Sequence, residues 1–290
     1  MIPELTAMII DIISLIVSSP IMQRAILASI LVAVIAATSG TFMVFRGLSF
    51  LTSGVAHAAL GGASLGLFLQ ATGIAPWFDP ILGAVIFAVF VAILTGYAGE
   101  RGIAQKMEVA VGVSFALSMS LAVFLMYYLP PTMIPRIWGY LIGDILLLDN
   151  LDIVLLIGTA LSLVLLIILF KKEFVYVSID MEGSTAHGMN ARGYHYLMLI
   201  FAAVAIALTT KAVGAILVYA ILVAPAAASN EILKTVNSVI IGVFIIALIS
   251  MLAGLAGSFT ILASPSAIAG LIAALSYIIA IQIKRFTGKD

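Results

Sequence analysis

The chain has 290 residues, of which 64% are hydrophobic and 9% are charged. Because soluble domains carry about a quarter charged residues, this composition excludes a soluble fold. The formal net charge is zero and cysteine is absent, so no nucleic acid partner is expected, and disulfides, thiolate metal sites and cysteine nucleophiles are excluded.

Residues 1–20 form the first predicted element. Glu4, Asp11 and Ser14 interrupt an otherwise apolar segment at near-helical spacing, which is typical of a helix that lies in the membrane interface rather than crossing it. The segment begins with Glu4 rather than with a basic region, so it does not read as a cleavable signal peptide. No linker or change of composition divides residues 21–290, which are expected to form a single transmembrane domain.

Apolar segments of about 20 residues recur along the rest of the chain, and this is the length that an α-helix needs to cross ~30 Å of hydrocarbon. The alternating pattern of an outer-membrane barrel is absent, so each segment must satisfy its backbone as a helix. We predict an all-α integral membrane protein with eight or, more consistently, nine transmembrane helices, at residues 22–45, 53–70, 80–98, 108–129, 150–170, 196–210, 212–227, 237–256 and 265–283.

The sixth and seventh predicted helices are short, and Thr209, Thr210 and Lys211 separate them. The seventh also contains Gly214 and Pro225. Interrupted pairs of this kind often line a path instead of facing lipid. Pro225 removes a backbone donor and is expected to kink or end its helix, so it is a candidate gating residue.

The basic residues predict how the chain is oriented in the cell membrane. Of the 13 lysine and arginine residues, only Arg24, Arg136 and Lys211 fall on one side when the spans alternate. The other side receives the remaining ones: Arg46, Arg101, Lys106, Lys171, Lys172, Arg192, Lys234, Lys284, Arg285 and Lys289. The positive-inside rule therefore predicts an extracytoplasmic N-terminus and a cytoplasmic C-terminus.

The longest polar stretch, residues 171–195, lies in a predicted cytoplasmic loop. Its polar residues include Asp180, Glu182, Ser184, Thr185, His187, Asn190 and Arg192. A soluble partner could dock there. The chain has no Gly-x-x-x-x-Gly-Lys-Ser/Thr loop, so any ATP must be hydrolysed by another chain.

His57 is the only histidine within a predicted span. Ser53, His57 and Gly61 share one helical face at i, i+4 and i+8, and this narrow, polar face could border a channel. Ionisable groups inside a membrane are costly and are functional candidates by default, and neutral imidazole is the commonest metal ligand. The structural alternative is that His57 hydrogen-bonds a neighbouring helix while glycines such as Gly61 allow close packing.

Asp144 follows Gly143 in a predicted extracytoplasmic segment. An acidic residue at a pore mouth could attract cations, whereas an exposed loop aspartate is usually a turn or cap residue. No carboxylate pair, Ser-His-Asp set or zincin motif is arranged for catalysis. The pattern therefore indicates transport rather than an enzyme.

Three segments resemble the zinc/manganese class of metal ABC transporter permeases, the ABC-3 class. They are residues 46–62 (RGLSFLTSGVAHAALGG), 140–146 (YLIGDIL) and 211–228 (KAVGAILVYAILVAPAAA). Their order and spacing extend the resemblance over nearly the whole chain, from residue 22 to about residue 283. Three segments in the same order and at the same spacing are far more specific than a single motif.

The resemblance implies a homodimeric permease of the compact type II ABC importer fold, which binds cytoplasmic ATP-binding subunits and receives metal from an extracytoplasmic metal-binding protein. It also implies that Asp180, Glu182, Ala186 and Gly188 belong to the coupling helix that enters the ATPase. The transported ion would be zinc or manganese, and no permanently bound cofactor is expected. An ion-gradient-driven secondary transporter is the alternative, although the near absence of intramembrane carboxylates argues against it.

One residue departs from the family pattern. Many members have an aspartate four residues before the signature histidine, where this chain has Ser53. A hydroxyl is a poor ligand for zinc or manganese. The resemblance then leaves His57 to act with Ser53 as a weak site, to act through water, or to meet the second His57 of a dimer.

Overall fold

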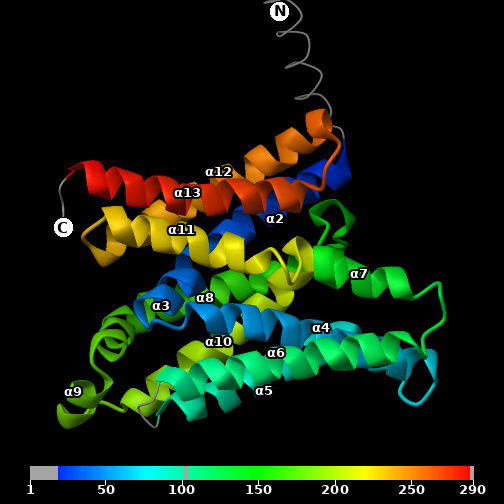
Figure 1. Ribbon diagram of the computed structural model, residues 1–290, viewed down its shortest axis with the longest axis horizontal. Coiled ribbons are helices and arrows are strands. Elements are labelled where there is room, and N and C mark those ends of the chain that lie inside the picture. The colour runs from blue at the N-terminus through cyan, green and yellow to red at the C-terminus, as the bar shows by residue number, and fades with distance from the viewer. Residues whose placement is uncertain (1–18, 101–103, 288–290) are drawn as a thin grey trace, which may run out of the picture.

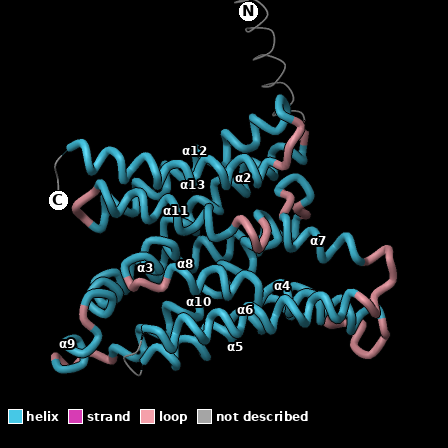
Figure 2. Tube along the Cα trace, viewed as in Figure 1, coloured by secondary structure: helices cyan, strands magenta, loops and turns pink. Residues whose placement is uncertain are grey.

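The computed structural model describes residues 19–100 and 104–287. Short loops join the helices, and the described residues contain no strand (Figure 2). The helices are α2 (Pro20–Ile35), the π-helix η1 (Ala36–Gly40), α3 (Thr41–Phe45), α4 (Ser49–Ala71), α5 (Pro80–Glu100), α6 (Ala104–Met126), α7 (Ile134–Ile142), the 3-10 helix η2 (Ile145–Leu147), α8 (Asn150–Ile179), α9 (Met181–Ala186), α10 (Ala191–Val213), α11 (Val218–Ile232), α12 (Val236–Ile261) and α13 (Pro265–Thr287).

The long helices run back and forth between two ends of one bundle (Figure 1). The short helix α7 marks one end and the short helix α9 marks the other, and these are called here the α7 end and the α9 end. The bundle begins with α2 at the α7 end, and α13 finishes at the α9 end (Figure 1). Helix α11 lies in the interior, in contact with α13, α12, η1 and α4.

Within the described residues, eight helices are long and apolar enough to cross a membrane, with α2, η1 and α3 forming one of them. The remaining predicted span, the seventh at residues 212–227, corresponds to α11, which has 15 residues and so is about 22 Å long at 1.5 Å per residue. The chain completes its alternation between the two ends only when α11 is counted as a crossing (Figure 1). The predicted interfacial helix at residues 1–20 lies outside the described residues, except that Ser19 caps α2 and Pro20 begins it.

Two predicted boundaries shift for identifiable reasons. Helix α10 begins at Ala191 rather than at residue 196, because the side chain of Asn190 accepts a hydrogen bond from the Gly193 amide at 3.0 Å and caps the helix. The next helix begins at Val218 rather than at residue 212, because α10 continues to Val213. The break therefore lies at residues 214–217.

The first span contains a π-helix over Ala36–Gly40, and all five of its residues are buried. Two hydroxyls in this segment donate to carbonyls one turn earlier: Thr38 Oγ1 to the Val34 carbonyl at 2.8 Å and Ser39 Oγ to the Ile35 carbonyl at 2.8 Å. A Cβ added to Gly40 would lie 2.2 Å from the Leu222 carbonyl oxygen. The π-helix thus brings the first span into close backbone contact with α11, and such bulges are frequent at functional sites.

Helix α7 closes the bundle at the break between α10 and α11. The amides of Ala215 and Ile216 donate to the carbonyls of Tyr140 and Leu141 at 2.9 Å and 3.2 Å. These bonds satisfy backbone groups that the break would otherwise leave unpaired inside the bundle. Helix α7 was not predicted from the sequence, because nine residues are too few for an apolar span.

Candidate functional site

His57 lies in the middle of α4, which is the most enclosed of the eight long helices. Its side chain is 6% exposed. The imidazole lies against the ring of Phe115 on α6, with ring centroids 4.1 Å apart. Its Nδ1 lies 2.8 Å from the carbonyl oxygen of Ser53, one turn earlier in the same helix.

This hydrogen bond determines which imidazole nitrogen is available. A carbonyl can only accept, so Nδ1 of His57 carries the proton and donates to Ser53. In the neutral ring Nε2 then keeps its lone pair, which is the arrangement found when a backbone carbonyl orients a metal-ligating histidine. The Ser53 carbonyl, rather than its hydroxyl, is the group that orients His57.

The described residues of one chain do not complete a metal site around His57. They contain no group of three or more His, Cys, Asp or Glu side chains that could hold a metal ion. Ser53 is half-buried, and a hydroxyl adds little affinity for zinc or manganese. The site built by one chain is therefore weak, with one neutral imidazole nitrogen as its principal donor.

The face of α4 that carries His57 packs tightly against α6. A Cβ added to Gly54 would lie 2.6 Å from Val111, and one added to Gly61 would lie 2.9 Å from the Ser118 carbonyl oxygen. Gly61 therefore lies where two helices touch, and a side chain there would push α6 away. On a neighbouring face of α4, Gly62 and Gly83 bring α4 into still closer contact with α5.

A cavity of about 580 Å³ opens at the α7 end. Its charged lining residues are Asp79, Arg136, Asp144, Asp149 and Lys211. Asp144 lines this cavity, and its Oδ1 accepts a hydrogen bond from the Leu146 amide at 2.9 Å. It is therefore the cap of η2, and its position at a pore mouth stays a prediction.

An ion pair lies beside this cavity. Lys211 Nζ lies 2.6 Å from Asp152 Oδ1 and 3.9 Å from Asp149 Oδ2. Asp149 and Asp152 also form a capping box at the start of α8. The hydrogen bond from the Asp152 amide, with the nearby Lys211 ammonium, lowers the pKa of the Asp149 carboxyl below its usual value.

Helix α9 forms a small projection at the opposite end of the bundle (Figure 1). It contains or adjoins the four residues predicted to couple to an ATPase. Asp180 caps α9, since its Oδ1 accepts from the Gly183 amide at 2.8 Å. Glu182 and Ala186 are exposed, and Gly188 follows the helix with a φ of +81°. The structure therefore presents a capped, exposed helix in the stretch expected to dock a soluble partner.

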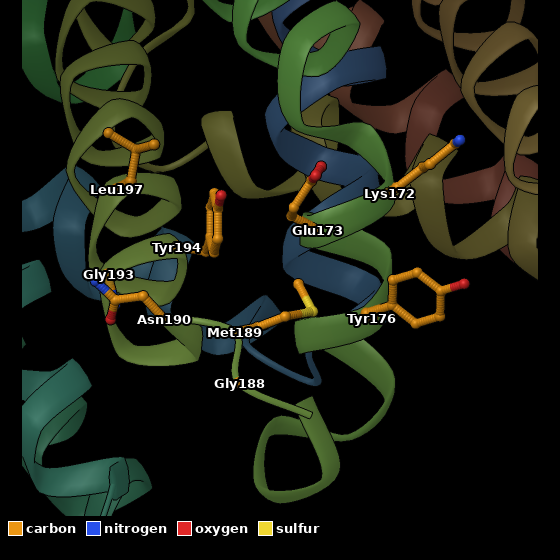
Figure 3. Close-up of a pocket in the computed structure, with 9 residues that line it drawn as sticks. All are labelled: Lys172, Glu173, Tyr176, Gly188, Met189, Asn190, Gly193, Tyr194 and Leu197. Carbon is orange, nitrogen blue, oxygen red and sulfur yellow. The ribbon is translucent and has the colours of Figure 1, made fainter. Parts of the chain in front are cut away.

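A second cavity, of about 550 Å³, lies beside α9. Figure 3 shows Lys172, Glu173 and Tyr176 of α8 on one side of it and residues of α10 on the other, with Gly188 and Met189 between them. The residues on this second side are Asn190, the N-cap of α10, and Gly193, Tyr194 and Leu197 of α10. The surface around α9 is thus hollowed rather than flat.

Pro225 lies inside α11, which continues past it to Ile232. The proline does not end its helix, because the neighbouring helices α12, α13 and α4 hold α11 on several sides. It still leaves the Ile221 carbonyl without its usual donor. A proline in an enclosed helix is tolerated when neighbours hold the freed group.

Two polar side chains that were not predicted as site residues meet near α9. Arg46 Nη2 lies 2.9 Å from His195 Nδ1. Each residue lay at the edge of a segment singled out in the sequence, Arg46 in residues 46–62 and His195 in residues 171–195. Their separation of 149 positions hides the contact from any local pattern.

The comparisons with known proteins cover almost the whole chain. The model of the ABC 3 transport family matches residues 18–284. The manganese import system permease protein ScaB of Streptococcus gordonii is 28% identical over 220 residues, which are 76% of this chain and 76% of ScaB. The high-affinity zinc uptake system membrane protein ZnuB of Haemophilus influenzae is 27% identical over 236 residues, which are 81% of this chain and 87% of ZnuB.

Solved structures share the arrangement of helices. A chain of PsaBC from Streptococcus pneumoniae in complex with Fab matches with a TM-score of 0.80 and 25% identity, covering 94% of this chain and 95% of that one. An inward-facing ABC transporter of the metal-chelate type matches with a TM-score of 0.71 at 14% identity, covering 93% of this chain and 88% of that one, and supports the fold alone. The predicted ABC permease fold is confirmed, while the count of nine spans and the orientation stay predictions.

Proposed function

This chain belongs to the ABC 3 transport family, and we propose that it is the permease subunit of an ATP-driven importer of divalent metal ions, zinc or manganese. It is a multi-pass membrane protein and a transport component rather than a catalyst. The observation that carries the proposal is the similarity of most of the chain to named metal permeases, combined with the buried His57 imidazole that a backbone carbonyl orients.

The two ends of the bundle support different tasks. The α7 end, proposed to be extracytoplasmic, has the cavity lined by Asp144 and Lys211, which offers room for an ion delivered by a metal-binding protein. The α9 end, proposed to be cytoplasmic, exposes the capped helix that would enter an ATP-binding subunit. His57 lies between them, on a helix that spans from one end to the other.

The geometry of His57 supports a transient rather than a tight site. One imidazole with an orienting carbonyl, on a helix that carries no carboxylate, binds a divalent ion weakly. Weak binding favours transport, since an ion must leave as readily as it enters. A homodimer would bring a second copy of His57 and could complete the coordination, and the two ATP-binding subunits expected would match its two α9 helices.

The decisive experiment reconstitutes the chain in proteoliposomes with its ATP-binding subunits, with ATP inside and metal-loaded binding protein outside. Manganese or zinc should accumulate only when ATP and a catalytically competent ATPase are both present. Uptake that persists without the ATPase and collapses when ionophores remove the ion gradients would instead identify a secondary transporter. Absence of uptake under every condition would contradict a transport role for this bundle.

A further inference from the structure

The guanidinium of Arg46 joins three segments of the chain at the α9 end. Its Nη1 donates to the Val177 carbonyl in the last turn of α8. Its Nη2 donates to His195 Nδ1 in the first turns of α10 at 2.9 Å, and it lies 3.6 Å from Met181 Sδ, the first residue of α9. One side chain therefore contacts both helices that flank α9 and α9 itself.

Arg46 belongs to a tight turn that leads directly into α4. It is the C-cap of α3, its amide bonds to the Phe42 carbonyl, and Gly47 follows with a φ of +66°. Helix α4 then begins at Ser49 and carries His57 about two turns later. A displacement of Arg46 is thus transmitted to a rigid helix that carries the imidazole.

The charge of Arg46 is held only by neutral groups. The guanidinium cannot accept, so Nδ1 of His195 must be unprotonated, and His195 is neutral in this contact. Among the described residues no carboxylate lies within ion-pair distance of Arg46, and its Nε is buried without a hydrogen-bond partner. A partly buried cation with neutral partners adds little stability, so its contacts are better explained by the positions that they impose.

Arginine is suited to this task because its donors form a planar, fixed fork. Lysine has a compact ammonium on a flexible stem and cannot hold separate acceptors in the same geometry. His195 extends the connection further, since a Cβ added to Gly96 of α5 would lie 3.6 Å from its Nε2. The cluster of Arg46, Val177, Met181 and His195, called here the Arg46 clasp, is therefore contiguous from α9 to α4 and α5.

We propose that Arg46 is a positioning residue that couples α9 to α4, so that a movement imposed on α9 reaches the helix that carries His57. The proposal rests on the proposed function, because it assumes that an ATP-binding subunit moves α9. The guanidinium of Arg46 is then the first link between α9 and the membrane-spanning helices.

The test measures a response to ATP at the far end of α4. Loss of a coupling residue should change this distant response, whereas loss of a residue that only packs locally should leave it in place. The chain has no cysteine, so Gln70→Cys adds one thiol at the end of α4, in the lining of the α7-end cavity. The rate of its reaction with a maleimide is measured in the complex with the ATP-binding subunits, without nucleotide and with ATP trapped by a hydrolysis-deficient ATPase. ATP-driven metal uptake by the same chain is measured in parallel.

With Arg46 present, ATP trapping should change the labelling rate at position 70 by about 5-fold or more. This is the lower end of the effect that binding at one site typically has on a second, coupled site. The Arg46→Lys chain should assemble with its ATP-binding subunits, and the complex should bind ATP normally. It should nevertheless lose most of the ATP-dependent change in labelling rate. His195→Leu should lose part of it, and the double variant should be no worse than Arg46→Lys alone, since both residues act in one network. Arg24→Gln removes an arginine at the opposite end of the bundle and should keep the full response.

An Arg46→Lys variant that keeps the wild-type response to ATP would overturn the proposal. So would a wild-type complex whose labelling rate ignores ATP while it still imports metal, and in that case the proposed function would stand and only the Arg46 clasp would fail. A wild-type complex with neither response nor uptake would contradict both.

Discussion

Gly143 and Gly214 pack backbone against backbone where α7 meets the break between α10 and α11. A Cβ added to Gly143 would lie 2.0 Å from the carbonyl carbon of Val213, and one added to Gly214 would lie 2.2 Å from the Ile142 carbonyl oxygen. Both glycines have positive φ values, 74° and 97°. Only residues without a Cβ let the carbonyls of α7 accept hydrogen bonds from the amides of the break.

Alanine at either glycine should therefore destabilise the fold. Gly143→Ala and Gly214→Ala each add a backbone clash to an unfavourable φ, so we expect each to cost roughly 2 kcal/mol or more. Thermal unfolding of the purified protein in detergent measures the effect. Gly139→Ala is the matched control, because its Cβ meets nothing within 4 Å and alanine favours the helix; a similar loss in all three variants would contradict the packing described.

The ion pair of Lys211 and Asp152 should respond asymmetrically to mutation. Asp152 is 4% exposed, whereas the side chain of Lys211 is 30% exposed. Lys211→Met leaves a buried carboxylate without its cation, and we expect it to lower the unfolding temperature more than Asp152→Asn does. The double variant should recover part of the loss. Equal losses in both single variants, with no recovery, would show that the pair does not act as a unit.

Asp149 should make the α7 end sensitive to acid. Its folded pKa lies below the ordinary value of 3.8, so its contribution to stability is present above that pH and is lost as the pH falls through the depressed folded pKa. Asp149→Asn keeps a capping side chain for α8 but cannot titrate. Wild type and variant should therefore differ in their loss of stability only below about pH 4, and identical acid titrations of thermal stability would refute the prediction.

Substitutions in α9 should uncouple ATP hydrolysis from transport. A bulky residue at Gly188 must adopt a φ of +81° and would distort the end of α9, while Glu182→Arg reverses an exposed charge. We expect the metal transported per ATP to fall for both Gly188→Val and Glu182→Arg, while the binding protein still delivers metal. Thr185→Ala, on the same exposed helix, is the control; unchanged uptake in Gly188→Val and Glu182→Arg would remove α9 from the coupling path.

Features with a local sequence signal were predictable. The spacing of Ser53, His57 and Gly61 places them on one face of a helix, as α4 shows, and His57 Nδ1 hydrogen-bonds the Ser53 carbonyl. Asp180 was assigned to the coupling segment by the family resemblance alone, and it caps α9. In both cases the contact spans only three or four residues, a range that helical periodicity and capping preferences cover.

Features that depend on tertiary contact were not predictable from one sequence. Lys211 was expected to separate two short spans, yet it ends α10 in a pair with Asp152, 59 positions away. The Arg46 clasp joins residues separated by more than 130 positions. The π-helix in the first span also has no propensity signal, since its hydroxyl bonds resemble those of ordinary serine and threonine in helices.

Ser53→Asp should strengthen the metal site. It places a carboxylate one turn before His57, and a carboxylate with an imidazole holds a divalent ion more firmly than an imidazole alone. We expect tighter binding, with a changed preference between zinc and manganese or slower release. Ser53→Ala is the control and should bind metal as wild type does. Metal titration of both purified variants measures the affinity. A Ser53→Asp variant with no gain in affinity would refute a metal site at this position.

The most direct measurement is ATP-driven uptake of manganese and zinc by proteoliposomes that contain equal amounts of folded wild-type or His57→Ala protein with the ATP-binding subunits. The free Nε2 of His57 is the proposed ligand of the ion during transport, so the variant should lose uptake by about 10-fold or more. Loss of a residue that only orients a metal ligand already has an effect of this size. The thermal stability of His57→Ala should fall no further than that of Phe115→Leu, which loosens the same packing. Wild-type uptake by His57→Ala would contradict the account, because His57 would then be a packing residue and the metal path would lie elsewhere in the bundle.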